Sequence, residues 1–250
     1  MKIVLSLLLL LVAIPVHAEV FNVAAASDLN FAIKEIIEQF ERNTGHKVRL
    51  TPGSSGNFYA QITNGAPFDV FLSADVDYPK RLEKSGKAVA GSTFTYGVGS
   101  ISLWVPQGSP IDVERLGMLA LLDPSIKKIA IANPEHAPYG RAAVEAMKAA
   151  KVYDRVKSKL VLGENISQAA QFVQSSAADI GIIAVSIAAS EPMRMGRQWR
   201  IPQDLYPALE QGAVLLNRAG AGAKAFHEWL RGPEARVVLT KYGFGRFANQ

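Results

Sequence analysis

The sequence predicts an α/β protein with two lobes, each a mixed, mainly parallel sheet flanked by helices. Three observations lead to this expectation. Short apolar runs alternate with stretches of helical periodicity, the turns between them are rich in Ser, Gly and Asn, and no internal repeat or low-complexity linker interrupts the pattern. The 250 residues are 49% hydrophobic and 20% charged, which is enough apolar material for a sizeable core. Polar turns at the ends of parallel strands favour a ligand cleft between the lobes.

The first 18 residues read as a secretory signal peptide. Lys2 precedes an apolar run, and Val16-His17-Ala18 forms a small-residue cleavage site, so cleavage is expected after Ala18. The alternative, a membrane anchor, is disfavoured because the apolar run is short for a bilayer and no second long run follows. The chain has no cysteine for lipidation, so the expected location of the mature protein is the periplasm.

The elements follow from periodicity in chain order. A β-prone run leads to a helix whose apolar residues recur at helical spacing until Gly45 ends it. In the first half of the mature chain we expect strands at 20–24, 47–51, 69–72 and 100–105, and helices at 28–42, 56–64 and 73–86. In the second half we expect strands at 128–132, 160–162, 180–185 and 213–216, helices at 141–150, 166–174, 219–230 and 234–242, and an irregular stretch at 190–204.

This layout suggests that the chain passes from one lobe to the other and back. We expect lobe I to comprise residues 19–99 and a return segment at 210–250, and lobe II to comprise residues 100–209. Strand-to-helix turns from both lobes would then face one cleft.

Charge and motifs exclude several classes of function. Loss of Lys2 leaves 26 Lys and Arg against 22 Asp and Glu, and the excess is scattered, so no nucleic-acid partner is expected. The chain has no Walker A loop, no G-x-S-x-G elbow and no His pair with metal-ligand spacing. We therefore expect a binding protein rather than an enzyme, with no cofactor and no side chain that ligates a metal directly.

Four turns carry the candidate binding groups: AAASD at 24–28, GSSGN at 53–57, APYG at 137–140 and GEN at 163–165. Their Ser and Asn side chains are ordinary helix caps, and capping is the plainer interpretation of each turn taken alone. Taken together, helix N-termini that converge on one cleft would bind an oxyanion without Lys or Arg. The turn cores contain no basic residue, and Arg141 is the only base that directly flanks one of them.

Several stretches resemble one known family. AAASDL, GSSGNFYAQITNGAPFDVFLSAD, ANPEHAPYGRAA, GENISQA and KYGF occur in the same order in periplasmic molybdate-binding proteins of ABC transporters, and they cover essentially the whole mature chain. The resemblance implies a two-lobed type II periplasmic binding fold and a tetrahedral oxyanion, molybdate or tungstate, held by neutral hydrogen-bond donors. It also implies a monomer that docks transiently on a membrane permease.

The resemblance assigns four ligand-binding positions. Ser27 and Ser55 match the family serines that donate through their hydroxyls and backbone N–H groups, and Tyr139 and Ile166 match positions that donate through their backbone N–H groups. Some members also place a tyrosine after the late strand. Here the matching position is Ala184, so another donor or a water would replace that contact.

Two neighbours of these positions are further candidates. Asn57 is an additional polar group in the second turn. Asp28 suits the first turn of a helix, but its carboxylate would repel an anion, so we expect it to point away from the site.

Two other functions remain as alternatives. The protein could bind another small oxyanion or an organic acid, and a carboxylate ligand would be indicated by an arginine such as Arg141 pointing into the cleft. A secreted serine hydrolase using Ser54 or Ser55 is the more distant alternative, because the sequence has no nucleophile motif.

Overall fold

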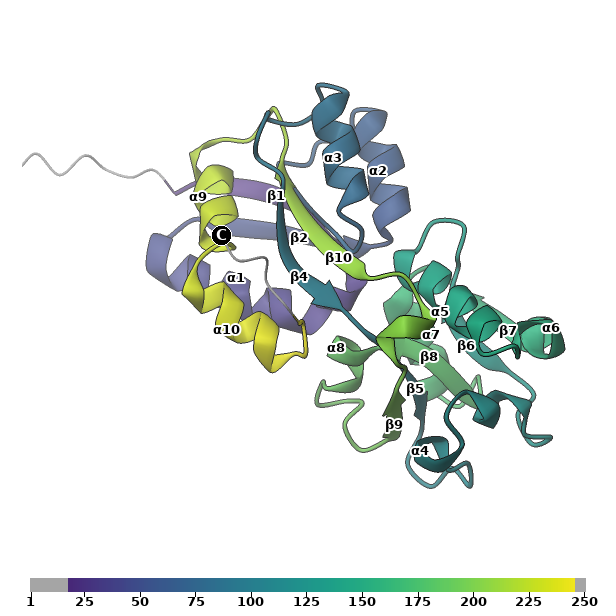
Figure 1. The fold of residues 1–250 in the computed structure, drawn as a ribbon. Coiled ribbons are helices and arrows are strands. Elements are labelled where there is room, and N and C mark those ends of the chain that lie inside the picture. Colours follow the sequence, from purple (N-terminus) through teal and green to yellow (C-terminus); the bar gives the residue numbers. More distant parts are fainter. Residues whose placement is uncertain (1–17, 246–250) are drawn as a thin grey trace, which may run out of the picture.

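The computed structural model describes residues 18–245 and has two α/β lobes joined by two chain crossings (Figure 1). Apart from Ala18, the predicted signal peptide lies outside the described residues. Among the helices of residues 18–245, none combines the length and apolar character needed to cross a membrane.

Lobe I is built on a five-stranded sheet with the order β2-β1-β3-β10-β4. Strands β1, β2 and β3 run parallel, whereas β10 runs antiparallel to both of its neighbours. The strands are β1 (Val20–Ala26), β2 (Lys47–Gly53), β3 (Val70–Ser73), β4 (Phe94–Gly99) and β10 (Leu209–Leu215).

Lobe II repeats this plan with the order β7-β6-β8-β5-β9. Strands β6, β7 and β8 run parallel, and β5 runs antiparallel to β8 and β9. The strands are β5 (Ile101–Val105), β6 (Ile129–Ala132), β7 (Leu160–Gly163), β8 (Ile180–Ala184) and β9 (Arg197–Arg200). Both sheets are therefore mixed, as the sequence predicts.

Helices cover both sheets (Figure 1). The helices of lobe I are α1 (Asn30–Thr44), α2 (Ser55–Thr63), α3 (Asp77–Lys84), α9 (Ala221–Trp229) and α10 (Pro233–Lys241). Those of lobe II are α4 (Val113–Leu116), α5 (Pro138–Ala149), α6 (Tyr153–Val156), α7 (Ile166–Gln174) and α8 (Val185–Ala188). Short 3₁₀ turns cover Ser27–Leu29, Gly117–Leu122, Lys157–Lys159 and Gln203–Leu205.

The two faces of the lobe I sheet have separate cores, which follow from the period of two along a strand. From β1, Phe21, Val23 and Ala25 belong to the core that packs under α1, α9 and α10. Ala24 points the other way, into the core beneath α2 and α3 with Phe58. From Val23 onward β1 is buried on both faces, and this part of the strand is a continuous apolar run, VAAA, as expected inside a parallel sheet.

Two strands and one helix start differ from the sequence-based expectation. The prediction of an irregular stretch at 190–204 is wrong, because β9 pairs there with β5. β9 has the sequence RQWR and lies at the edge of its sheet, where charged side chains remain in solvent and hide the alternation expected of a strand. β4 was also not predicted, and two glycines interrupt its apolar pattern. Ser27 does not cap α1, since it begins a 3₁₀ turn and α1 starts at Asn30.

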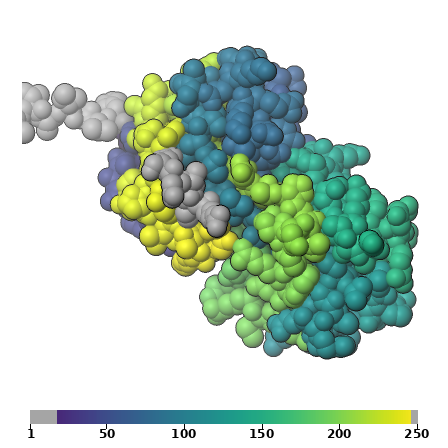
Figure 2. All heavy atoms as spheres, viewed as in Figure 1, coloured from purple at the N-terminus to yellow at the C-terminus, as the bar shows by residue number. Residues whose placement is uncertain are grey.

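The chain crosses between lobes at two places. β4 ends at Gly99 and β5 begins at Ile101, whereas the return runs between β9 and β10, with β10 starting at Leu209. Gly99 is required by close packing, because a Cβ there would lie 2.2 Å from the Tyr139 hydroxyl oxygen. The two lobes lie against each other along this boundary (Figure 2).

Candidate functional site

The four predicted turns meet in one small pocket between the lobes. Residues 26–28, 53–55, 137–139 and 165–166, together with Ala74, line a cavity of about 10 Å³, which we call the small pocket. It contains all four predicted ligand-binding positions, Ser27, Ser55, Tyr139 and Ile166, each of them buried. Among the described residues that line it, none is Lys, Arg or His.

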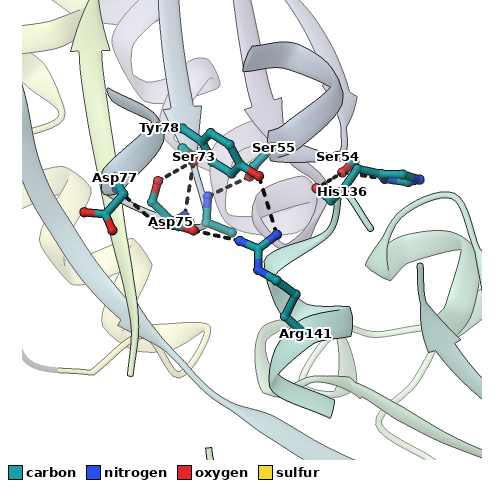
Figure 3. Close-up of polar contacts among 9 residues, drawn as sticks. Ser54, Ser55, Ser73, Asp75, Asp77, Tyr78, His136 and Arg141 are labelled. Atoms are coloured by element: carbon teal, nitrogen blue, oxygen red, sulfur yellow. Dashed lines mark hydrogen bonds and ion pairs between the residues drawn. The ribbon is translucent and has the colours of Figure 1, made fainter. Parts of the chain in front are cut away.

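The start of α2 presents one backbone N–H and one hydroxyl to the small pocket. Gly56 N–H is already used, since it donates to the carbonyl of His136 across the lobe boundary at 2.9 Å. The hydroxyl oxygen of Ser55 accepts the N–H of Ala74 at 2.9 Å (Figure 3), so its hydrogen is left for another acceptor. A side chain at Gly56 would place Cβ 2.6 Å from the His136 carbonyl oxygen, so this close approach of the lobes requires glycine.

The start of α7 is arranged in the same way. Asn165 is the predicted cap, and its side-chain oxygen accepts the N–H groups of Ser167 and Gln168 at 3.0 and 3.1 Å. The N–H of Ile166, the first residue of the helix, does not donate to this cap. The Ser27 hydroxyl of lobe I also donates to the Asn165 side-chain oxygen at 3.1 Å, which ties the first turn to the fourth.

The start of α5 supplies a third N–H group. Pro138 occupies the first position and has no N–H, and the Ala137 carbonyl accepts from Gly140 and Arg141. Tyr139 lies between Pro138 and Gly140, and its N–H takes part in neither of these contacts. Among residues 18–245, the N–H groups of Ser55, Tyr139 and Ile166 make no backbone hydrogen bond to a turn, a loop or the opposite lobe. The local structure therefore uses most of the first-turn donors and leaves these three at the small pocket.

Next to the small pocket lies a buried polar cluster formed by Asp28, Tyr96, Tyr139 and Gln211. Asp28 Oδ2 accepts from the Tyr139 hydroxyl at 2.9 Å and from the Gln211 amide at 2.6 Å. The Gln211 amide also donates to the Tyr139 oxygen at 2.9 Å, and the Tyr96 hydroxyl donates to Gln211 Oε1 at 2.8 Å. Tyr139 belongs to lobe II and the other three to lobe I, so the cluster joins the lobes.

Burial controls the protonation of this cluster. It raises the pKa of Asp28 from 3.8 to about 7, although the two side-chain donors act in the opposite direction. Burial and the nearby Asp28 charge also raise the pKa values of Tyr96 and Tyr139 well above 10, so both phenols stay neutral and can donate. Asp28 lines the small pocket, and its second oxygen, Oδ1, is buried without a partner among the described residues.

Arg141 does not reach the small pocket. Its guanidinium donates to Asp75 Oδ2 at 2.7 Å and to the Tyr78 hydroxyl at 3.4 Å, so an ion pair from α5 to lobe I neutralises it (Figure 3). This pair borders a separate cavity of about 570 Å³, which we call the large cavity, between the start of α3, α5 and residues 207–210. The structure thus gives no arginine to hold a carboxylate ligand in the small pocket.

Ala184 and Asn57 lie outside the small pocket. Ala184 is fully buried at the end of β8, opposite Ile101, so the position that matches the family tyrosine contributes to the core of lobe II. The Asn57 amide donates to Glu164 Oε1 at 2.5 Å, which is another contact between the lobes. In the small pocket, Asn165 and Asp28 stand as polar neighbours of the four predicted positions.

A serine, a histidine and a glutamate do come together at the edge of the small pocket. The Ser54 Oγ atom lies 3.0 Å from His136 Nδ1, and His136 Nε2 lies 3.7 Å from Glu164 Oε2. The Ser54 hydroxyl, however, donates to the His136 carbonyl at 2.6 Å (Figure 3), and the residue is 5% exposed. These contacts hold the lobes together, and they use the hydroxyl proton that a general base would have to remove. Over residues 18–245, no group of three His, Asp or Glu side chains could hold a metal ion.

The fold and the pocket define a class of protein: two α/β lobes, joined by two crossings, that enclose a small polar site at the ends of their strands. Comparison with known proteins specifies the family. Residues 21–245 match the family described as bacterial extracellular solute-binding protein, and the chain belongs to it.

Named relatives agree with this assignment. The chain is 41% identical over 238 residues to the molybdate-binding protein ModA of Azotobacter vinelandii, covering 94% of this chain and 93% of the relative. It is 43% identical over 234 residues to the molybdate-binding protein ModA of Rhodobacter capsulatus, covering 93% and 90%. The solved structure of the Azotobacter vinelandii periplasmic molybdate-binding protein aligns with a TM-score of 0.84 at 32% identity, covering 91% of this chain and 99% of that one.

Proposed function

We propose that this protein captures molybdate, and also tungstate, in the small pocket and delivers it to an ABC import permease. The observation that carries the proposal is the set of unused donors: the N–H groups of Ser55, Tyr139 and Ile166, all at helix starts, and the hydroxyl hydrogen of Ser55. The Ser27 hydroxyl lies beside them and would exchange its bond to Asn165 for one to the anion. Relatives that are 41% and 43% identical over nearly the whole chain carry the name molybdate-binding protein.

Capture follows from the replacement of the anion's water shell by fixed neutral donors. Each hydrogen bond to a charged group contributes about 1.5–3 kcal/mol. Helix starts add the partial positive charge of unpaired N–H groups, and α5 and α7 come from lobe II whereas α2 comes from lobe I. An anion bound by all three helix starts therefore favours the closed arrangement of the lobes.

Selectivity follows from size and from the protonation state of the anion. Sulfate and phosphate are smaller than molybdate, so donors fixed for molybdate would not all reach them. Protonated phosphate would also need an acceptor for its hydrogen. Tungstate is nearly the size of molybdate and is expected to bind by the same contacts.

The remaining parts of the function rest on the family. The proposed location is the periplasm, after removal of residues 1–18. The proposed partner is the membrane permease, which would receive the protein as a monomer with its lobes closed around the anion. No nucleic acid, resident metal or organic cofactor is part of the proposal.

Isothermal titration calorimetry of the mature protein with molybdate, tungstate, sulfate and phosphate tests the proposal. We expect saturable binding of molybdate and tungstate with one site per chain, and no binding of sulfate or phosphate at the same concentrations. Binding of sulfate or phosphate in preference to molybdate would overturn the assignment and support the alternative of another small oxyanion.

A further inference from the structure

Asp28 presents an electrostatic conflict in a pocket that binds a dianion. Asp28 is 1% exposed, and it is one of the residues that line the small pocket, beside Ser27. Tyr139 connects Asp28 to the small pocket, because its backbone N–H is at the pocket and its hydroxyl donates to Asp28 Oδ2 at 2.9 Å. An ionised Asp28 would therefore place a negative charge next to the bound anion in a region of low dielectric, where like charges repel strongly.

The groups around Asp28 leave one way to remove this charge. The ionisable groups that face it are two neutral phenols, Tyr139 from α5 and Tyr96 from β4. β10 contributes the amide of Gln211, and α8 contributes Ser186, whose hydroxyl donates to the Asp28 carbonyl at 2.8 Å. No Lys, Arg or His side chain of the described residues neutralises the carboxylate. The remaining route is protonation from solvent.

The two oxygens of the carboxyl group are suited to different protonation roles. Oδ2 accepts two hydrogen bonds, from Tyr139 and Gln211, and keeps them whether the group is ionised or neutral. Oδ1 has no hydrogen-bond partner among residues 18–245 and is buried. A proton on Oδ1 therefore removes the charge without breaking the contacts that join the lobes.

We infer that Asp28 couples anion capture to the uptake of one proton, so that the protein binds its dianion together with H⁺. The inference rests on the proposed function, because it concerns the same pocket and the same ligand. In chemical balance, the ionised Asp28, one dianion and one proton from solvent give the complex with a neutral carboxylic acid. Asp28 is thus a specificity residue of the site. Its ionised carboxylate repels a dianion more than a monoanion, so binding of a dianion depends more strongly on protonation of Asp28.

The inference fixes how affinity depends on pH. Burial raises the pKa of Asp28 from 3.8 to about 7 in the protein without ligand, and a bound dianion raises it further. Below pH 7 the group is already protonated and affinity stays flat. Above pH 7 the affinity for molybdate falls by up to about tenfold for each pH unit, because each binding event must take up a proton.

Calorimetric titration with molybdate in two buffers of different ionisation enthalpy measures this proton directly. For wild type we expect uptake of about 0.9 proton per anion at pH 8 and about 0.1 at pH 6, as follows from a single group with a pKa near 7. Asp28→Asn keeps an acceptor for Tyr139 and Gln211 but cannot ionise, so its uptake at pH 8 should vanish and its affinity should not change with pH. Glu114→Gln, an exposed carboxylate of α4 at the far end of lobe II (Figure 1), is the matched control and should behave as wild type.

Tyr139→Phe gives a further directional test. It removes one donor to Oδ2, and donors lower the pKa of a carboxyl group, so the onset of proton uptake should move to higher pH. The ring of His136 lies at the edge of the pocket and is retained in Asp28→Asn, so the difference between that variant and wild type isolates Asp28. If wild type binds molybdate without proton uptake at pH 8, or if Asp28→Asn keeps the wild-type uptake, the inference is wrong. If wild type binds no molybdate at any pH, the proposed function itself fails.

Discussion

Substitution of Ser55 by alanine separates a residue that binds the anion from its neighbours. Ser55 is the first residue of α2, and its hydroxyl oxygen accepts the Ala74 N–H at 2.9 Å, so its hydrogen can be donated to the ligand. Loss of one hydrogen bond to a charged group costs about 1.5–3 kcal/mol. The dissociation constant for molybdate should therefore rise about 10- to 150-fold in Ser55→Ala.

The same substitution has a second, separable cost. The Ala74 N–H loses its acceptor, and Ala74 is 1% exposed. An unsatisfied buried donor costs about 1–3 kcal/mol, so Ser55→Ala should lower the free energy of unfolding by about that amount without any ligand. Urea denaturation measures this stability, and titration calorimetry at a temperature where both proteins are folded measures the affinity.

Ser54→Ala is the matched control. Its hydroxyl donates to the His136 carbonyl at 2.6 Å, and that carbonyl keeps the Gly56 N–H as a second donor. This variant should weaken molybdate binding less than Ser55→Ala does, because it loosens a contact between lobes and removes no contact to the anion. Wild-type affinity in Ser55→Ala, with a larger loss in Ser54→Ala, would refute the assignment of Ser55.

Three further predictions concern closure and charge. Gly56→Ala places a Cβ 2.6 Å from the His136 carbonyl oxygen in the opposite lobe, so molybdate affinity should fall at least tenfold, as calorimetry would show. Arg141→Ala and Asp75→Ala remove an ion pair whose side chains are 40% and 29% exposed, so a double-mutant cycle on molybdate affinity should give a coupling of at most about 1 kcal/mol that shrinks in high salt. Burial raises the pKa of Asp28 from 3.8 to about 7. Unliganded wild type should therefore lose up to about 4 kcal/mol of unfolding free energy relative to Asp28→Asn as pH rises from 4 to 7, with no further loss above pH 7. Equal pH profiles of unfolding free energy for the two proteins would contradict this.

Much of the fold follows from local pattern. The strands of the two parallel sets, and the turns after them, are indicated by apolar runs that end in Ser, Gly or Asn. The place of Asn165 before a helical stretch predicts a cap, and the structure confirms this. β9 does not follow from the sequence pattern because a charged edge strand lacks the alternation of a half-buried one, and β4 does not because its glycines interrupt the pattern.

The candidate site also has a part that the sequence indicates and a part that it does not. The residue types at the four turns could be found from the sequence because each lies where a strand gives way to a helix. The contacts between them could not, since Ser27 and Asn165 are 138 positions apart, and Asp28 and Gln211 are 183 positions apart. Nothing local marks Gln211 as a partner of a buried carboxylate. Such pairs depend on how the two crossings bring the lobes together, which a pattern along the chain does not specify.

The most direct measurement is a crystal structure of the molybdate complex, with the metal located by its anomalous scattering. We predict one anion in the small pocket, with oxygen atoms in hydrogen-bond distance of the Ser27 and Ser55 hydroxyls and of the Tyr139 and Ile166 N–H groups, and with no Lys or Arg contact. An anion bound instead in the large cavity, against Arg141 or Lys80, would contradict the account.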